Sequence, residues 1–228
     1  MANFIDCVSI IFIHFSVNEE RSSLARKSLK SLQETIHTPL EIMVVDNGEN
    51  IEDSKFFLEE CQNKRISLYI RNADNLHYAL ARNQAMKLVE GEYVVIVDDD
   101  LIYEDGWLEK CIWLLKQTFP QKMIASPLSC STKGGSRWRK DDIEIENEKF
   151  NVNTRAGSNC MVMRKETMND LGFFPIHPKS GSRYADRLTR KGYAVISPKI
   201  NMAYDMGYKK SGSYWLQKYN TEKTLYAK

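Results

Sequence analysis

The stretch Gly91-Glu-Tyr-Val-Val-Ile-Val-Asp-Asp-Asp100 decides the fold class of this chain. Its β-branched run from Tyr93 to Val97 is typical of a strand buried on both faces, and three adjacent aspartates end it abruptly. Similar apolar runs occur at Val8–Phe15, Leu40–Val45 and Ile66–Ile70, and stretches of helical periodicity separate them. This alternation of strand and helix predicts an α/β protein with a mostly parallel central sheet and helices on both faces.

Helices are predicted for the intervals between these strands and for part of the second half. In the first half they cover the charged stretch that ends at Gln33 and the ranges Phe56–Cys61, Tyr78–Val89 and Trp107–Lys116. The second half is less regular, with strands expected at Lys122–Pro127, Asn159–Arg164 and Tyr193–Ser197 and helices at Lys165–Leu171, Tyr184–Lys191 and Tyr214–Tyr226. The polar segment Ser129–Lys149 is expected to form an excursion or a hairpin over the surface.

The charges are unevenly distributed along the 228 residues, although the formal net charge is only +2. Residues 1–114 hold 11 basic and 20 acidic side chains, whereas residues 115–228 hold 21 basic and 10 acidic ones. A nucleic-acid-binding protein of uniformly basic character would not have an acidic half, because that half would repel the phosphate backbone. We therefore expect no nucleic-acid partner, and we expect the first half to use carboxylates.

The cysteines and the apolar segments bear on the compartment. The five cysteines are widely spaced and have no CxxC pairing, so we expect reduced thiols in a cytoplasmic protein. The longest apolar stretch, Cys7–Val17, is interrupted by Ser9, His14 and Ser16 and is too short for a span of about 20 residues. The length fits a single domain over residues 1–228, which we expect to be soluble and intracellular.

Polar side chains follow the predicted strands at their carboxyl ends, where ligands bind in open parallel sheets. Asp46 follows the second strand, Arg71 and Asn72 follow the third, and Asp98-Asp99-Asp100 follows the fourth. Adjacent carboxylates repel one another, and Mg²⁺ or Mn²⁺ would offset that repulsion. Because side chains alternate along extended backbone, Asp98 and Asp100 can face one site and Asp99 another. The alternative interpretation is an acidic turn that caps the next helix.

Taken singly, other polar residues have equally plain interpretations. Asp46 before Asn-Gly is also typical of a turn, and Arg82 and Asn83 within a predicted helix are also typical of a solvated face. Their position on successive strand–helix units is what favours a shared site.

Three motifs follow the strand end Val44-Val45-Asp46-Asn47-Gly48: Asn75-Leu-His-Tyr-Ala-Leu-Ala-Arg-Asn83, then Gly91 to Asp100, then Asp105-Gly-Trp-Leu-Glu109. Together they resemble the motifs of the family 2 glycosyltransferases of the GT-A fold. The resemblance covers residues 7–116 well. It is looser from Ala156 to Arg164 and from Asn169 to Pro175, which are similar to the family's acceptor-side segment.

The resemblance implies roles for individual residues. Residues 1–116 would form the nucleotide-sugar-binding half and residues 117–228 the acceptor-binding half. Asp46 would bind the nucleotide base, Asp98 the ribose or donor sugar, and Arg82 would lie near the donor sugar or diphosphate. Asp100 would be the principal metal ligand, with Asp98 beside it. The backbone near His14, Ser16 and Asn18 would line the nucleotide pocket.

Several positions depart from the family pattern. His77 stands where the family usually has Gly, and it either crowds the donor or caps the helix. The pair of acidic residues that supplies the catalytic base is not present as such; Asp186 is the best available base, and the alternative is an exposed Asp paired with Arg183 or Arg190. Asp205 stands where many members place a metal-binding His, and the alternative is a turn residue.

The expected function is that of an inverting, metal-dependent transferase that uses Mn²⁺ or Mg²⁺. It would move a hexosyl or hexosaminyl group from a nucleotide diphosphate sugar, with UDP favoured, to a glycan or lipid-linked glycan in polysaccharide biosynthesis. The alternatives are a nucleotidyltransferase that releases pyrophosphate and a non-catalytic nucleotide-sugar-binding module. Trp138 and Tyr184 are candidates for stacking on the acceptor sugar, or else pack internally. The aromatic and basic residues after Lys209 either contact an anionic membrane surface peripherally or form a solvated helix.

Overall fold

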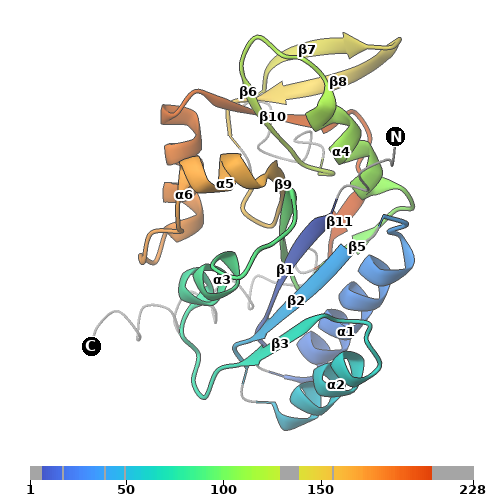
Figure 1. Ribbon diagram of the computed structural model, residues 1–228, viewed down its shortest axis with the longest axis vertical. Helices are drawn as coiled ribbons and strands as arrows, with labels where there is room; N and C mark the ends of the chain where they lie inside the picture. The colour runs from blue at the N-terminus through green and yellow to red at the C-terminus, as the bar shows by residue number, and fades with distance from the viewer. Residues whose placement is uncertain are drawn as a thin grey trace.

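A computed structural model of the chain describes residues 7–16, 18–38, 40–48, 50–128, 139–155 and 157–206. A nine-stranded sheet of order β3-β2-β1-β4-β9-β6-β10-β8-β7 forms its centre, and β11-β5 forms a second sheet of two strands (Figure 1). The elements in chain order are β1 (Val8–His14), α1 (Glu19–Glu34), β2 (Leu40–Asp46), α2 (Ile51–Gln62), β3 (Leu68–Arg71), α3 (Tyr78–Met86), β4 (Tyr93–Asp98), β5 (Leu101–Tyr103), α4 (Trp107–Lys116), β6 (Lys122–Ala125), β7 (Arg139–Ile145), β8 (Glu148–Asn153), β9 (Cys160–Arg164), α5 (Lys165–Leu171), α6 (Ser180–Arg190), β10 (Tyr193–Pro198) and β11 (Ala203–Asp205).

The first four strands run parallel and end at one edge of the sheet. In the register of β1 with its two neighbours, His14 lies opposite Asp46 of β2 and Ile13 lies opposite Asp98 of β4. The parallel register therefore brings the polar strand ends of the first half together, as the sequence predicts.

The second half continues the same sheet with mixed strand directions. β9 pairs antiparallel with both β4 and β6, and β10 pairs parallel with β6. The predicted hairpin is present as β7 and β8, which pair antiparallel and end the sheet at the top of Figure 1. The helix expected at Tyr214–Tyr226 and the loop residue Trp138 lie outside the described residues.

Two short strands were not predicted. β5 and β11 have three residues each and pair antiparallel, with Leu101 opposite Asp205 and Tyr103 opposite Ala203. A run of three residues is too short to show a strand periodicity, and the two segments lie about a hundred positions apart in sequence. Their pairing places Asp205 beside the end of β4, because the Met206 amide donates to the Asp100 carbonyl at 2.9 Å.

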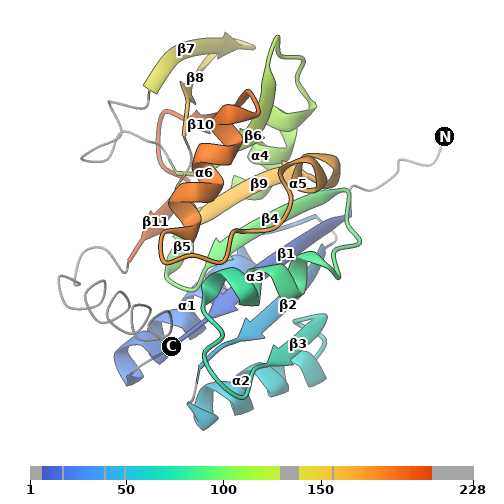
Figure 2. The same cartoon turned by 90° about the vertical axis from the view of Figure 1, so that its left-hand side faces the viewer.

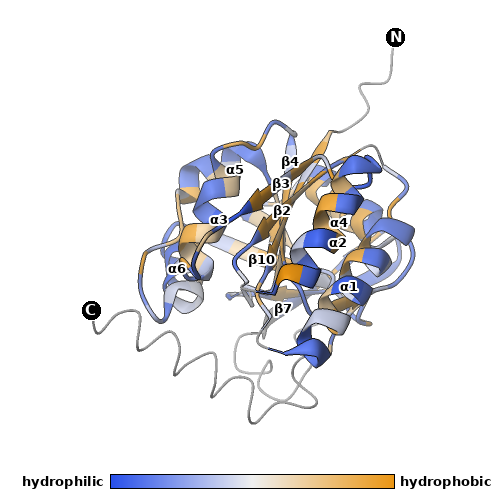
Figure 3. Cartoon of the chain, turned by 90° about the horizontal axis from the view of Figure 1, so that it is seen from below, coloured by the Kyte–Doolittle hydropathy of each residue, from blue (hydrophilic) through white to orange (hydrophobic). Residues whose placement is uncertain are grey.

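Apolar side chains cover both faces of the sheet and explain its long buried runs. The side chains on the sheet face that includes Phe12 pack on α1, α2 and α4. Those on the opposite face, which includes Ile11, pack on α3, α5 and α6. Figure 2 shows α3, α5 and α6 in front of one face, and Figure 3 shows the helices with their apolar sides toward the sheet. The prediction of helices on both faces is confirmed.

The described residues also bear on the cysteines and on the apolar length of the helices. Cys7, Cys61, Cys111 and Cys160 are all free thiols, as expected. Among the described helices, none is long and apolar enough to cross a membrane.

Gly91 sits where the turn before β4 crosses the start of β1. A Cβ at this position would lie 2.7 Å from the Ser9 amide nitrogen and 2.8 Å from the Cys7 carbonyl oxygen, both of which are backbone atoms. Gly91→Ala is therefore expected to lower the free energy of unfolding by about 1–3 kcal/mol, measured by urea denaturation. Glu90→Ala, at the exposed neighbouring position, should change it by less than about 0.5 kcal/mol. Equal stability of the two variants would contradict the close approach.

Candidate functional site

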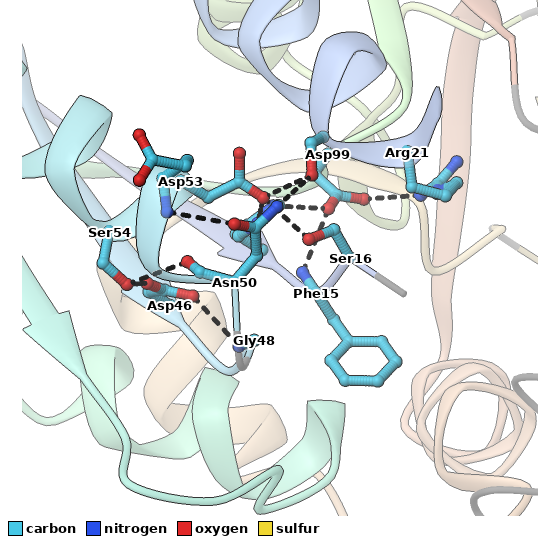
Figure 4. A network of polar contacts seen from close by, with 12 residues as sticks. Phe15, Ser16, Arg21, Asp46, Gly48, Asn50, Asp53, Ser54 and Asp99 are labelled. Atoms are coloured by element: carbon cyan, nitrogen blue, oxygen red, sulfur yellow. Dashed lines mark hydrogen bonds and ion pairs between the residues drawn. The ribbon is translucent and has the colours of Figure 1, made fainter. Parts of the chain in front are cut away.

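A polar network at the strand ends includes Ser16, Asp53 and Asp99 (Figure 4), and a buried histidine contacts both aspartates. His14, the last residue of β1, contacts Asp99 through Nδ1 at 3.0 Å and Asp53 of α2 through Nε2 at 3.1 Å. Burial disfavours the charged ring, but the two carboxylates outweigh it and raise the pKa of His14 to about 9. His14 is thus an imidazolium that joins the carboxyl end of β4 to α2.

Asp53 collects hydrogen bonds from α1 and from the end of β1. Its carboxylate accepts from the hydroxyls of Ser16 at 2.7 Å and Ser22 at 2.6 Å, and from Arg26 at 2.6 Å. Burial would raise the pKa of Asp53, but His14 and these donors hold it below its usual value. Ser16, expected to line the nucleotide pocket, therefore has its hydroxyl in the network. The sequence analysis missed Asp53, because nothing local distinguishes it from other helix-start carboxylates.

The three adjacent aspartates have different partners. Asp98 pairs with Arg82 of α3, and Asp99 pairs with His14 and, at 2.9 Å, with Arg21 of α1. Arg21 also contacts Asp100 at 3.3 Å. The carboxylates therefore take part in tertiary ion pairs, which an acidic surface turn would not form. Asp99 and Asp100 share Arg21 whereas Asp98 meets Arg82, which differs from the prediction that Asp98 and Asp100 face one site and Asp99 another. The strict alternation ends because β4 ends at Asp98 and the next two residues form a turn.

Asp100 carries the clearest sign of excess negative charge. Burial, together with the nearby carboxylates of Asp99, Asp98 and Asp205, raises its pKa to about 7, although Arg21 opposes the shift. Asp205 accepts a hydrogen bond from Asn159 at 3.3 Å, so its carboxylate is held beside the end of β4. The arrangement brings the predicted metal ligands Asp98, Asp100 and Asp205 into one electrostatic neighbourhood.

Hard carboxylate oxygens fit Mg²⁺ or Mn²⁺, which proteins hold through one or two carboxylates while water and substrate phosphates complete the coordination. A divalent cation would also remove the mutual repulsion that raises the pKa of Asp100. Within the described ranges, no three His, Cys, Asp or Glu side chains are grouped so that they could hold a metal ion by themselves. The donor set therefore fits a metal that shares its coordination with a bound phosphate.

Arg82 is a buried residue with a fixed guanidinium and does not belong to a solvated face. Its side chain is 1 % exposed, and its guanidinium carbon lies 4.9 Å from the centre of the Tyr78 ring and 5.0 Å from that of Phe174. A second hydrogen bond runs from Arg82 to the Ser158 carbonyl at 3.0 Å. These contacts aim the charged end of Arg82 at Asp98.

Asn83, the next residue, holds Phe174 in place against Arg82. Its amide donates to the Phe174 carbonyl at 2.9 Å and accepts from the Phe174 amide at 2.8 Å. Phe174 in turn stacks on Tyr184, with ring centres 3.9 Å apart. Tyr184 is fully buried, so the prediction that it stacks on an acceptor sugar is wrong and the packing alternative is confirmed.

Asp46 is fully buried and has partners on both carboxylate oxygens. It accepts from the Gly48 amide at 3.0 Å, from Ser54 at 2.8 Å and from the Tyr69 hydroxyl at 2.8 Å. This is the geometry of a turn residue that also ties β2 to α2 and β3. Its contact with a nucleotide base stays a prediction.

The loop before α3 is organised by side chains at the ends of β2 and β3. Asn47 accepts from Asn72 at 3.0 Å and from the Leu76 amide at 3.2 Å, a role that the sequence analysis missed. His77 accepts from the Ala79 amide at 3.2 Å and is the N-cap of α3. The capping interpretation of His77 is therefore confirmed. Asn18, likewise, is the N-cap of α1.

A family comparison fits this geometry. The family model described as glycosyl transferase family 2 matches residues 12–174, which is well over half of the chain. The chain belongs to glycosyl transferase family 2. The match runs from the end of β1 through β2, β3, α3, β4 and the three aspartates, and it ends before α6.

Several known proteins are similar to this family 2 chain at low identity. Protein CgeD of Bacillus subtilis (strain 168) is 22% identical over 212 residues, which are 85% of this chain and 46% of CgeD. The mannosyltransferase PcManGT from Pyrobaculum calidifontis, solved with GDP-Man and Mn²⁺, superposes with a TM-score of 0.69 at 17% identity, over 98% of this chain and 65% of that one. GalNAc-T7 with UDP, GalNAc and Mn²⁺ gives a TM-score of 0.68 at 10% identity, over 98% of this chain and 48% of that one.

S. aureus TarS 1–349 in complex with UDP-GlcNAc gives a TM-score of 0.61 at 17% identity, over 91% of this chain and 61% of that one. The family 2 chain thus has the GT-A fold of these glycosyltransferases, as the sequence resemblance implies. It spans about half the length of its curated relative and less than two thirds of each of these solved chains.

Asp186 lies on α6, beyond the segment that the family 2 model matches. It is exposed on the outer side of the helix and forms an ion pair with Arg155 at 2.9 Å, while Arg190 donates only to its main-chain oxygen. The part of α6 that contacts the site is its first turn, where the Gly181 amide donates to the Tyr78 hydroxyl at 2.5 Å. Asp186 is five residues further along, or about 7.5 Å along the helix axis. Its role as base stays a prediction.

Proposed function

We propose that this chain is a metal-dependent inverting glycosyltransferase that takes a sugar from a nucleotide diphosphate sugar. The observation that carries the proposal is the joint position of Asp98, Asp100, Asp205 and Arg82 at the carboxyl edge of a GT-A sheet. Two of the similar solved structures hold UDP or UDP-GlcNAc and one holds GDP-Man, which favours a uridine donor.

The described residues have separate tasks in this proposal. Asp100 and Asp205 would hold the cation, with Asp98 beside them. Asp46 would contact the nucleotide base of the donor. When bound, Mn²⁺ or Mg²⁺ supplies Lewis-acid stabilisation of the departing diphosphate. Arg82 holds Asp98 in place through its guanidinium. Its buried ion pair fixes the Asp98 carboxylate before the donor binds.

The acceptor hydroxyl must lose its proton as the new glycosidic bond forms, and an inverting reaction places the base on the face opposite the leaving diphosphate. We assign this task to Asp186. To accept the proton, its carboxylate would have to exchange the Arg155 ion pair for the acceptor hydroxyl.

Asp186→Asn tests this assignment. We expect kcat to fall about 10²–10⁴-fold while donor affinity stays unchanged, because a positioned general base contributes an effect of that size. Glu166→Gln, an exposed carboxylate on α5, is the control and should leave kcat unchanged. Near-normal turnover of Asp186→Asn would mean that another group removes the proton.

A thermal-shift panel of nucleoside diphosphates with and without Mn²⁺ tests the donor class. We expect a Tm increase of a few degrees for UDP that requires Mn²⁺, because a ligand that binds only the folded state stabilises it. Turnover assays should then release nucleoside diphosphate. Release of pyrophosphate would identify a nucleotidyltransferase, and binding without any turnover would identify a non-catalytic module.

The acceptor would be a glycan or lipid-linked glycan bound by residues 117–228, and the sugar would be hexosyl or hexosaminyl. Peripheral membrane contact would come from the C-terminal residues, which lie outside the described ranges. Co-sedimentation with anionic vesicles, with and without about the last 20 residues, tests that contact.

A further inference from the structure

We propose that Arg21 is an internal cation of the aspartate cluster that competes with the divalent ion for Asp100. The proposal rests on the metal site of the proposed function and adds a residue that tunes it. The guanidinium of Arg21 bridges two carboxylates, with one nitrogen 2.9 Å from Asp99 and another 3.3 Å from Asp100. Arg21 therefore occupies space beside the oxygen atoms that a metal ion would bind.

The position of Arg21 is fixed by the start of α1. Asn18 caps the helix by accepting from the Arg21 amide at 3.0 Å, so Arg21 lies in the first turn and its side chain extends toward the end of β4. The side chain is only 7 % exposed, and that of Asp100 is 13 % exposed. Water therefore screens the ion pair weakly, and the charge of Arg21 acts strongly on the neighbouring carboxylate.

Two consequences follow for a cation that approaches Asp100. The guanidinium already neutralises part of the carboxylate charge, and its fixed positive charge repels a divalent ion a few ångströms away. Both effects weaken the binding of the metal alone. Negative charge from a diphosphate offsets the same repulsion, so Arg21 makes the site favour the metal–diphosphate pair over the free metal.

The test of this inference is the affinity for Mn²⁺ in the absence of nucleotide, so it does not depend on activity. The affinity is measured by calorimetry or by electron paramagnetic resonance of free Mn²⁺. At a pH well above 7, where Asp100 is ionised, Arg21→Gln is expected to bind Mn²⁺ about tenfold more tightly than the wild type. The loss of the ion pair lowers the Tm of this variant without metal. Arg21→Lys keeps the charge and should bind as weakly as the wild type. Lys30→Gln removes an exposed charge from the same helix and controls for net charge. Asp100→Asn should abolish the gain in affinity when combined with Arg21→Gln.

The outcomes separate the two proposals. Mn²⁺ binding that is unchanged or weaker in Arg21→Gln overturns the role of Arg21 and leaves the metal site standing. Absence of Mn²⁺ binding in both proteins, with and without UDP, overturns the metal site and the role of Arg21 together. If Arg21→Gln does not fold, NMR of the wild type replaces it as the test. The side-chain signal of Arg21 is assigned by its loss in Arg21→Lys, and we expect this signal to shift when Mg²⁺ is added to saturation. Absence of a shift would overturn the proposal.

Discussion

Asp100→Asn is expected to lower the rate of glycosyl transfer by about a hundredfold or more and to leave the fold intact. Lewis-acid stabilisation of a leaving group contributes several kcal/mol to transition-state stability, and Asp100 is the carboxylate proposed to hold the metal. The variant should be no less stable than the wild type without metal. In the folded protein, burial and three neighbouring carboxylates already disfavour the charge on Asp100.

The measurement is turnover at saturating donor over a range of Mn²⁺ concentrations, together with urea denaturation without metal. Asp105→Asn is the matched control, since Asp105 is an exposed aspartate in the following turn that pairs with His37. Turnover of Asp100→Asn within about tenfold of the wild type would contradict the metal role. A large loss of metal-free stability would instead indicate a structural role.

The second large effect concerns His14 and the stability of the fold at alkaline pH. Its pKa is raised from 6.5 to about 9 in the folded protein, so folding favours the protonated ring. This contribution is fully present below about pH 6.5 and is lost as the pH rises through about 9, and its size is about 3 kcal/mol. The raised pKa of Asp100 also lowers stability with rising pH, but that effect is complete by about pH 7.

Urea denaturation between pH 7 and pH 10 tests the contribution of His14 in its lower part, up to about pH 8.5. Above that, the buried thiols of Cys111 and Cys160, whose pKa values are also raised, add a loss of stability of their own. His14→Gln is expected to lower the free energy of unfolding by about 3–5 kcal/mol at pH 7, because Asp53 and Asp99 lose a charged partner in the interior. The stability of this variant should depend little on pH between 7 and about 8.5. His37→Gln, at an exposed histidine paired with Asp105, is the control. A wild-type stability that stays constant from pH 7 to pH 10 would contradict the imidazolium.

These two residues have different relations to the proposed chemistry. Asp100 is the carboxylate proposed to hold the metal, whereas His14 is fully buried and contacts Asp99. Arg21 connects them through its contacts with Asp99 and Asp100. One buried ion-pair network would therefore link the stability of the fold to the proposed metal binding.

Local sequence patterns determined the individual elements. The helices at Trp107–Lys116 and Lys165–Leu171 have the predicted bounds, because their ends coincide with changes of apolar periodicity. The strand ends were predicted within a residue or two in the first half, because a polar residue follows each buried run. Those patterns also placed Asp46 and Asp98 at one edge of a parallel sheet.

Only the tertiary structure decided which partners these residues have. His14 and Asp99, Arg21 and Asp100, and Asn83 and Phe174 are 79 to 91 positions apart in the chain. Their local sequence does not distinguish Arg21 and Asp53 from other charged residues near the start of a helix. The strand that places Asp205 beside Asp100 is too short to show a periodic pattern. Apolar periodicity shows which side of a single helix or strand is buried. Ion pairs between elements depend instead on how the helices pack against the sheet. The sequence therefore determined the sheet and its polar edge, and the packing of α1, α2 and α3 decided how that edge is charged.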